Sequence, residues 1–161
     1  MSNSKFQKLV NNSFLFRLYL LKSLPMAFIA GIRVKELTQE KAITTVKFKW
    51  LTQNPFRSMY FACEAMAAEM STGLLVMNAI YKSSPPVSML IIENKASYYK
   101  KAVGEITFTC TDGKIISEII NKVKQSGKSI SADIKSVGVD ESGDKVAEFV
   151  FTCSLKAKSN I

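Results

Sequence analysis

Two carboxylates, Glu64 and Glu69, are the only charged side chains in the apolar stretch from Ser58 to Tyr81. A carboxylate in apolar surroundings is costly unless it is paired, neutralised or used. A buried carboxyl with a raised pKa is also what general-base chemistry requires. Because the two residues lie five positions apart, they point in different directions on a helix and do not form an acid pair. We therefore interpret Glu64 as an edge or interface residue.

The sequence contains no histidine, which excludes Ser-His and Cys-His catalysis and removes the commonest metal ligand. Cys63, Cys110 and Cys153 lie far apart in apolar contexts and form no CxxC motif. We interpret them as reduced core residues of a cytoplasmic protein. The seven glycines are too scattered for a phosphate-binding loop. The sequence therefore predicts no metal and no other cofactor.

The net charge of +9 comes from 22 Lys and Arg against 13 Asp and Glu. Nucleic acid, a membrane surface or an anionic small ligand each accounts for such an excess, and so does an ordinary solvated surface. Arginine, which base readout and phosphate recognition favour, occurs only at Arg17, Arg33 and Arg57. We therefore expect no nucleic-acid partner.

The N-terminal region is apolar from Phe14 to Ile32, but Arg17 and Lys22 interrupt it and Pro25 breaks it. This pattern fits neither a signal peptide nor a membrane-spanning helix, so no stable membrane insertion is expected. Residues 3–23 instead predict one amphipathic helix that ends before Pro25. Its apolar face is expected to pack onto the domain, although an interfacial position on a membrane is the alternative.

The stretch from Ser58 to Tyr81 is rich in Ala, Met and Leu, lacks proline, and predicts a helix buried on every side. Alternating or continuous apolar runs predict strands on both sides of it, and spaced isoleucines predict a second helix. The expected strands are 26–37, 42–51, 87–100, 103–111, 130–134 and 146–156, the second helix covers 115–123, and 140–144 forms a hairpin turn. This order predicts an α+β fold in which one antiparallel sheet wraps around a long central helix, with an extra N-terminal helix. We expect a single domain over residues 1–161, with the N-terminal helix in 1–25 and the core in 26–156.

The segment Asn54–Glu69 resembles the hotdog-fold thioesterase superfamily, and in particular its poorly characterised thioesterase-like branch. In that family Asn or Gln starts a loop, His-Gly-Gly opens the central helix, and an Asp or Glu follows two to three turns later. Asn54 matches the polar starter and Glu69 matches the acid. Tyr60, Phe61 and Ala62 stand where the family has His-Gly-Gly.

The resemblance implies an acyl-CoA thioesterase in which Glu69 is the general base or the nucleophile. The backbone N–H of Phe61 would stabilise the oxyanion, and Asn54 would orient water or the thioester carbonyl. Tyr60, Ala62, Met66 and Met70 would contact the substrate, with the methionines along an acyl channel. The family also implies a homodimer or dimer of dimers whose site includes both subunits. The coenzyme's phosphates would meet lysines such as Lys100, Lys101 and Lys128.

The alternative is a non-catalytic dimer that binds a fatty acyl chain or acyl-CoA, which the loss of both glycines favours. The individual residues also have ordinary interpretations: Glu69 as a paired structural carboxyl, Asn54 as a loop or cap residue, and the methionines as core.

Overall fold

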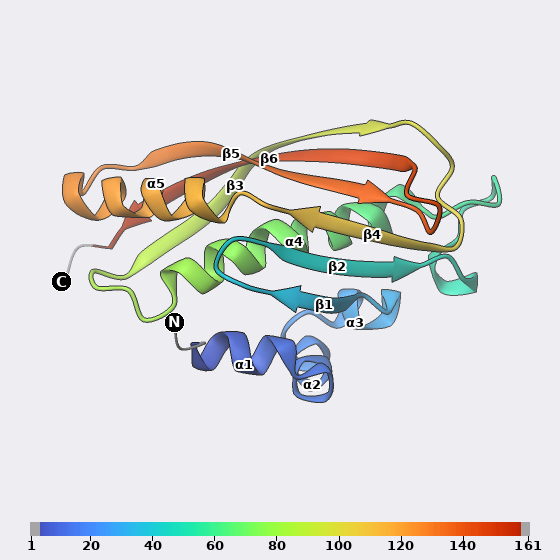
Figure 1. Cartoon of the computed structure of the whole chain (residues 1–161), viewed down its shortest axis with the longest axis horizontal. Helices are drawn as coiled ribbons and strands as arrows, with labels where there is room; N and C mark the ends of the chain where they lie inside the picture. Colours follow the sequence, from blue (N-terminus) through green and yellow to red (C-terminus); the bar gives the residue numbers. More distant parts are fainter. Residues whose placement is uncertain (1–3, 159–161) are drawn as a thin grey trace.

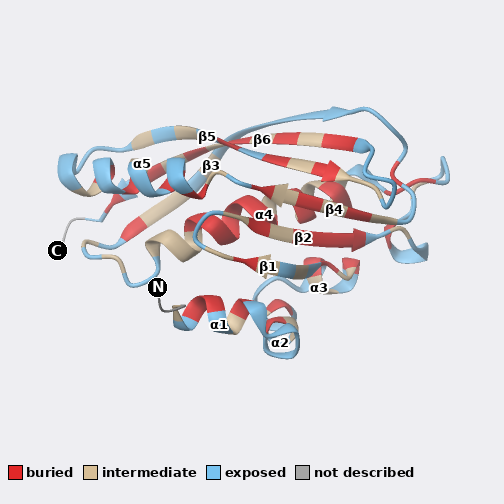
Figure 2. Cartoon of the chain, viewed as in Figure 1, coloured by how far each residue is buried: buried red, intermediate tan, exposed pale blue. Residues whose placement is uncertain are grey.

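A 20-residue helix, α4 (Phe61–Ile80), runs through the centre of the molecule with one sheet curved around it (Figure 1). The computed structural model describes residues 4–158. Buried positions occupy most of α4, as an apolar helix without proline predicts (Figure 2). The helix contacts β2, β4, β5 and β6, so it fills the concave side of the sheet. The expected buried central helix is confirmed.

The sheet is antiparallel throughout and has the strand order β1-β2-β4-β5-β6-β3. Alternation decides which side chains face α4: in β4, Ile106, Phe108 and Cys110 are all buried. In β2 the hydroxyl of Thr44 donates a 2.7 Å hydrogen bond to the carbonyl of Ala67 on α4, which marks the inner face. The strands are β1 (Arg33–Leu37), β2 (Ala42–Lys47), β3 (Val87–Tyr98), β4 (Glu105–Cys110), β5 (Ile130–Val139) and β6 (Lys145–Ala157). This is the hotdog arrangement, and the predicted α+β class is confirmed.

Strand β3 forms one edge of the sheet and pairs only with β6. Its first residue, Val87, is buried, but its second half is exposed along its whole length (Figure 2). Leu90 is 65% exposed and Ile92, at a bulge in the register, is 54% exposed. Such an edge leaves a row of unpaired backbone groups beside exposed apolar side chains.

The N-terminal region is not the single helix that the spacing predicts. Asn12 ends α1 (Lys5–Asn11) and begins α2 (Ser13–Ser23), because its side chain accepts a hydrogen bond from the Leu15 N–H at 3.1 Å. Residue 3, the expected start, lies outside the described residues. The break also changes which face is covered: Phe16 is buried while Phe14 is 72% exposed.

The strand expected over 26–37 is wrong in its first half. Pro25 starts a third helix, α3 (Pro25–Ala30), and Gly31, with φ of 78°, ends it. Only Arg33–Leu37 is a strand. A short apolar run fits a strand and a buried helical turn equally well, and here proline and glycine at its two ends favour the turn.

The remaining elements follow the sequence with small shifts at their ends. The strand expected over 42–51 stops at Lys47, and a short 3-10 turn, η1 (Trp50–Thr52), follows it. The second amphipathic helix is α5 (Gly113–Ser126), which packs against α4. The hairpin turn between β5 and β6 is confirmed by the 3.0 Å hydrogen bond from the Asp140 N–H to the Asp144 carbonyl.

Candidate active site

The N-terminus of α4 opens into a surface groove of about 400 Å³. Tyr60 is the N-cap residue, and no side chain caps the first turn. The groove is lined by Phe61 from the helix and by the loop, strand and connecting residues Asn54, Ser58, Met59, Tyr98, Tyr99, Lys100 and Lys101. An uncapped helix start presents backbone N–H groups and the positive end of the helix dipole, so it suits a negatively charged oxygen.

Asn54 organises the loop beside the groove. Its Nδ2 donates to the Ser58 hydroxyl at 3.1 Å and to the Met59 carbonyl at 3.0 Å. Its Oδ1 accepts from the Phe56 N–H at 2.9 Å. The amide is therefore used within the loop, and Asn54 holds the approach to α4 in place.

Glu69 lies two turns further along α4, at a second cavity of about 220 Å³. Met66 and Met70 line the same cavity, and Leu24 to Ala27 of the α2–α3 corner form its other wall. Burial raises the pKa of Glu69 above its ordinary value of 4.5. Among residues 4–158 the carboxyl forms no ion pair. Three of the predicted site residues thus meet at one apolar cavity.

Gly73 makes the room that the Glu69 carboxyl occupies. A Cβ atom at Gly73 would lie 2.9 Å from Oε1 of Glu69, closer than such contacts ordinarily come, and its other near contacts are atoms of the same side chain. The glycine sits one turn beyond Glu69 in the interior of α4, where it costs helix stability. Its absent side chain sets the direction of the carboxyl.

Glu64 is the more deeply buried of the two carboxylates, at 4% exposure. Its Oε2 has no hydrogen-bond partner among the described residues. Burial raises the pKa of Glu64 to about 7. Burial, and to a smaller extent the charge of Glu64, raises the pKa of Tyr98, a residue of the groove. In this chain Glu64 is a core residue rather than an edge residue.

The two halves of the predicted site are well separated on one chain. Phe61 and Glu69 are eight residues apart on α4, which corresponds to about 12 Å along the helix axis. They line different cavities. One thioester carbonyl therefore cannot reach both groups of the same chain.

The other predicted residues do not line either cavity. Tyr60 is 48% exposed and its ring meets that of Phe61 edge to face at 4.9 Å. Ala62 is half-buried, and neither it nor Tyr60 lines the groove or the Glu69 cavity. Lys128 follows α5, at the end of the molecule opposite to the start of α4 (Figure 1). Within residues 4–158 no group of three or more Cys, Asp or Glu side chains converges as metal ligands.

Known structures share this fold at low sequence identity. The protein of unknown function PA5026 from Pseudomonas aeruginosa, a probable thioesterase, superposes with a TM-score of 0.74 at 18% identity, over 98% of this chain and 97% of that chain. Thioesterase HI1161 from Haemophilus influenzae superposes with a TM-score of 0.63 at 14% identity, over 87% of this chain and 88% of that chain. Protein OLEI01261 of unknown function from Chlorobaculum tepidum superposes with a TM-score of 0.70 at 12% identity, over 88% of this chain and 92% of that chain. At these identities the likeness establishes the fold alone.

Sequence comparison places the chain more narrowly. Among curated proteins none matches it. None of the described helices is long and apolar enough to cross a membrane. The family described as domain of unknown function (DUF4442) matches residues 13–155, which is most of the chain. The chain therefore belongs to that family, and it shares the hotdog fold with the known structures named above.

Proposed function

We propose that this protein hydrolyses acyl thioesters of the acyl-CoA type, with Glu69 as the general base. The ionised carboxyl takes a proton from water while the oxygen of that water attacks the carbonyl carbon. The C–S bond then breaks, and the protonated Glu69 returns its proton to the leaving thiolate, which releases the acid and the thiol. The developing oxyanion accepts a hydrogen bond from the Phe61 N–H at the start of α4. In an alternative route the Glu69 carboxylate attacks the carbonyl carbon directly and displaces the thiolate, and water then hydrolyses the mixed anhydride that forms.

One observation carries the proposal: an unpaired carboxyl with a raised pKa lies at an apolar cavity that two methionines line. Met66 and Met70 offer flexible apolar contacts to an acyl chain. Glu69 is poised beside them with its pKa above 4.5, closer to neutral pH than an ordinary carboxyl. Glu64 is also unpaired among the described residues, so the cavity with its two methionines is what distinguishes Glu69.

The separation along α4 supports a homodimer, with a dimer of dimers as its larger form. If Phe61 and Glu69 of one chain cannot reach the same carbonyl, Glu69 of one copy must work with Phe61 of the other. The free edge of β3, with Leu90 and Ile92 exposed, suits pairing with a second copy. Sedimentation of the purified protein would test this, because a monomer would contradict a shared site.

The groove at α4 suits the coenzyme part of the substrate. Lys100 and Lys101 both line it, and their charges complement phosphate groups. Lys100 also pairs with Asp140 at 2.6 Å and Asp144 at 2.7 Å, so Lys101 is the freer of the two. The three cysteines are buried and free, which fits the cytoplasm as the location.

The second candidate is the non-catalytic acyl-binding module. Phe61, which stands where the thioesterase family has glycine, is 55% exposed beside the groove and packs against Tyr60. These rings narrow the approach of a thioester to the backbone N–H. In that function the cavity at Glu69 holds the acyl chain and no bond is broken.

Thiol release from short, medium, long and aromatic acyl-CoA substrates tests the proposal. Glu69→Gln keeps the shape of the side chain but removes the base, so we expect a loss of about 10²–10⁴-fold in kcat. Glu64→Gln is the matched control, because it removes a second carboxyl with a raised pKa from the same helix.

The pattern of losses distinguishes the candidates. Turnover that falls in Glu69→Gln and persists in Glu64→Gln supports the enzyme. Turnover that falls only in Glu64→Gln moves the base to Glu64. Binding of acyl-CoA without turnover in the unsubstituted protein supports the binding module.

A further inference from the structure

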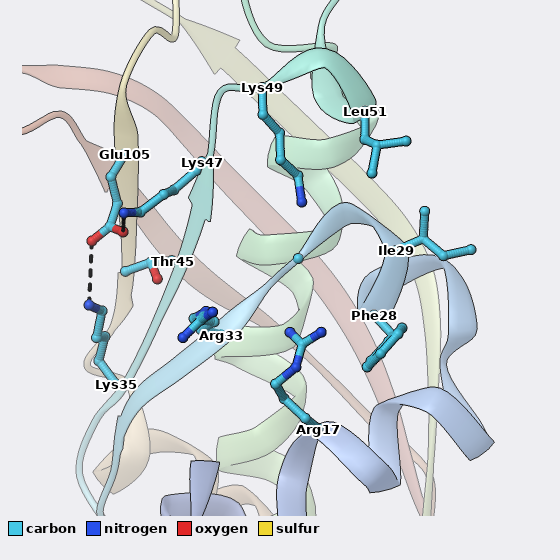
Figure 3. A pocket seen from close by; sticks show the side chains of 11 residues that line it. Arg17, Phe28, Ile29, Arg33, Lys35, Thr45, Lys47, Lys49, Leu51 and Glu105 are labelled. Atoms are coloured by element: carbon cyan, nitrogen blue, oxygen red, sulfur yellow. Dashed lines mark ion pairs between the residues drawn. The ribbon is translucent and has the colours of Figure 1, made fainter. Parts of the chain in front are cut away.

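A basic pocket of about 580 Å³ lies between the N-terminal helices and the first strands (Figure 3). Five cationic side chains line it: Arg17, Arg33, Lys35, Lys47 and Lys49. The only acidic residue among its lining is Glu105. Two of the three arginines in the whole sequence therefore meet at one pocket.

The five cations are not equally neutralised. Glu105 pairs with Lys35 and with Lys47, each at 3.4 Å, on one side of the pocket. Arg17, Arg33 and Lys49 have no carboxylate within ion-pair distance among the described residues. Three unneutralised cations that share one concave surface create a strong local preference for an anion.

Packing directs two of these cations into the pocket. The guanidinium of Arg17 stacks over the Phe28 ring, with its Cζ atom 4.3 Å from the ring centroid. This stacking uses the face of the guanidinium and leaves the N–H groups at its edge free to donate hydrogen bonds. The ammonium of Lys49 lies so close to Gly31 that a Cβ atom there would be 2.6 Å from it. Gly31 thus ends α3 and, because it has no side chain, leaves space for the Lys49 side chain.

The pocket lies on the opposite face of the sheet from α4. Thr44 points towards α4, so its neighbour Thr45, which lines the pocket, points away from it. Arg33 is paired with Thr45 across the two strands and therefore shares this outer face. The pocket is accordingly separate from the cavity at Glu69 and independent of the proposed hydrolysis.

We infer that this pocket binds a phosphate ester, with the phosphate among Arg17, Arg33 and Lys49. Arginine forks match the geometry of phosphate oxygens, and the volume falls in the range of about 300–1,000 Å³ that small-molecule sites occupy. Phe28, Ile29 and Leu51 form an apolar wall next to the cations (Figure 3). The organic part of the ester is therefore apolar or aromatic, and inorganic phosphate fills only part of the site.

Calorimetric titration with inorganic phosphate and with phenyl phosphate tests the inference. We expect phenyl phosphate to bind with the lower Kd, because its ring reaches the apolar wall. Arg17→Gln with Arg33→Gln should raise that Kd by about a hundredfold, about tenfold for each guanidinium, because hydrogen bonds between ionised partners are strong. Lys122→Gln with Lys156→Gln removes the same charge from exposed sites elsewhere and should leave the Kd nearly unchanged.

Two further arms locate the ligand and its source. Amide NMR shifts of the unsubstituted protein should change around Gly31 and Arg33 rather than along α4. Vesicles of phosphatidylcholine with and without phosphatidic acid test a lipid headgroup: arginine-dependent binding to the vesicles alone would assign the phosphate to lipid. No binding of phenyl phosphate or of the vesicles that contain phosphatidic acid, or equal weakening by both double substitutions, would overturn the inference.

Discussion

Replacing Glu64 by glutamine should stabilise the protein, and increasingly so as the pH rises. The carboxyl is 4% exposed and its Oε2 has no hydrogen-bond partner among the described residues. Glutamine has nearly the same shape as the protonated acid but cannot ionise. The substitution therefore removes the cost of holding a charge in the core without leaving a cavity.

The pKa of Glu64 sets the size of the effect. It rises from 4.5 to about 7 in the folded protein, a difference of about 2.5. Below pH 4.5 the group is protonated in both states and costs nothing. Between pH 4.5 and about pH 7 the carboxyl of the unfolded chain releases its proton while that of the folded chain keeps it. The free energy of unfolding therefore falls as the pH rises through this range. Above pH 7 the loss levels off at about 3 kcal/mol, from about 1.4 kcal/mol for each pKa unit.

Urea denaturation at pH 4.5 and pH 8 measures this difference. Glu64→Gln should match the unsubstituted protein at the lower pH, to within about 1 kcal/mol, and exceed it by about 3 kcal/mol at the higher pH. Glu118→Gln, on the exposed face of α5, is the control and should show no such gain. Equal stability of Glu64→Gln and the unsubstituted protein at pH 8 would refute the reasoning, because the carboxylate would then be solvated or paired.

Other predictions concern the Glu69 carboxyl and the core. Gly73→Ala should leave the free energy of unfolding unchanged or raise it by up to about 1 kcal/mol, because alanine favours helix. Thioester hydrolysis should nevertheless fall, because the Glu69 carboxyl must move away from the new Cβ atom. Unchanged turnover would contradict the role given to the position of this carboxyl. The rate of hydrolysis should rise with pH through the raised pKa of Glu69, because only the ionised base accepts a proton, and Glu69→Gln should abolish this rise in a pH–rate profile. Gly138→Ala should lower the free energy of unfolding by about 1–3 kcal/mol in urea, since its Cβ would lie 2.5 Å from Cε1 of the buried Phe108.

Much of the fold was predictable because its strongest signals are periodic. The alternation of Ile106, Phe108 and Cys110 marks one face of a strand, and the absence of proline and polar runs from Phe61–Ile80 marks a buried helix. Strand order was not predictable in this way. The position of β3 at the edge beside β6 depends on long-range pairing that no local pattern contains.

The surroundings of the candidate site residues depend on the fold more than on local sequence. The resemblance to the thioesterase superfamily selected Glu69, and Met66 and Met70 lie at the same cavity as its side chain. The deep burial of Glu64 could not be foreseen, because its neighbour Tyr98 comes from a distant strand. The use of the Asn54 amide within its own loop had a local signal, since Asn before Pro commonly organises a turn.

The wrong prediction over residues 26–37 falls on the segment that gives Glu69 its surroundings. Leu24 to Ala27, at the start of α3, form the wall opposite Met66 and Met70. A strand there would present alternate side chains to α4, whereas the helical turn places consecutive ones against the cavity. The turn exists because Pro25 starts it and Gly31 ends it, and Gly31 also accommodates Lys49 at the basic pocket. One short helix thus contributes to both candidate sites, because its two ends lie near opposite faces of the sheet.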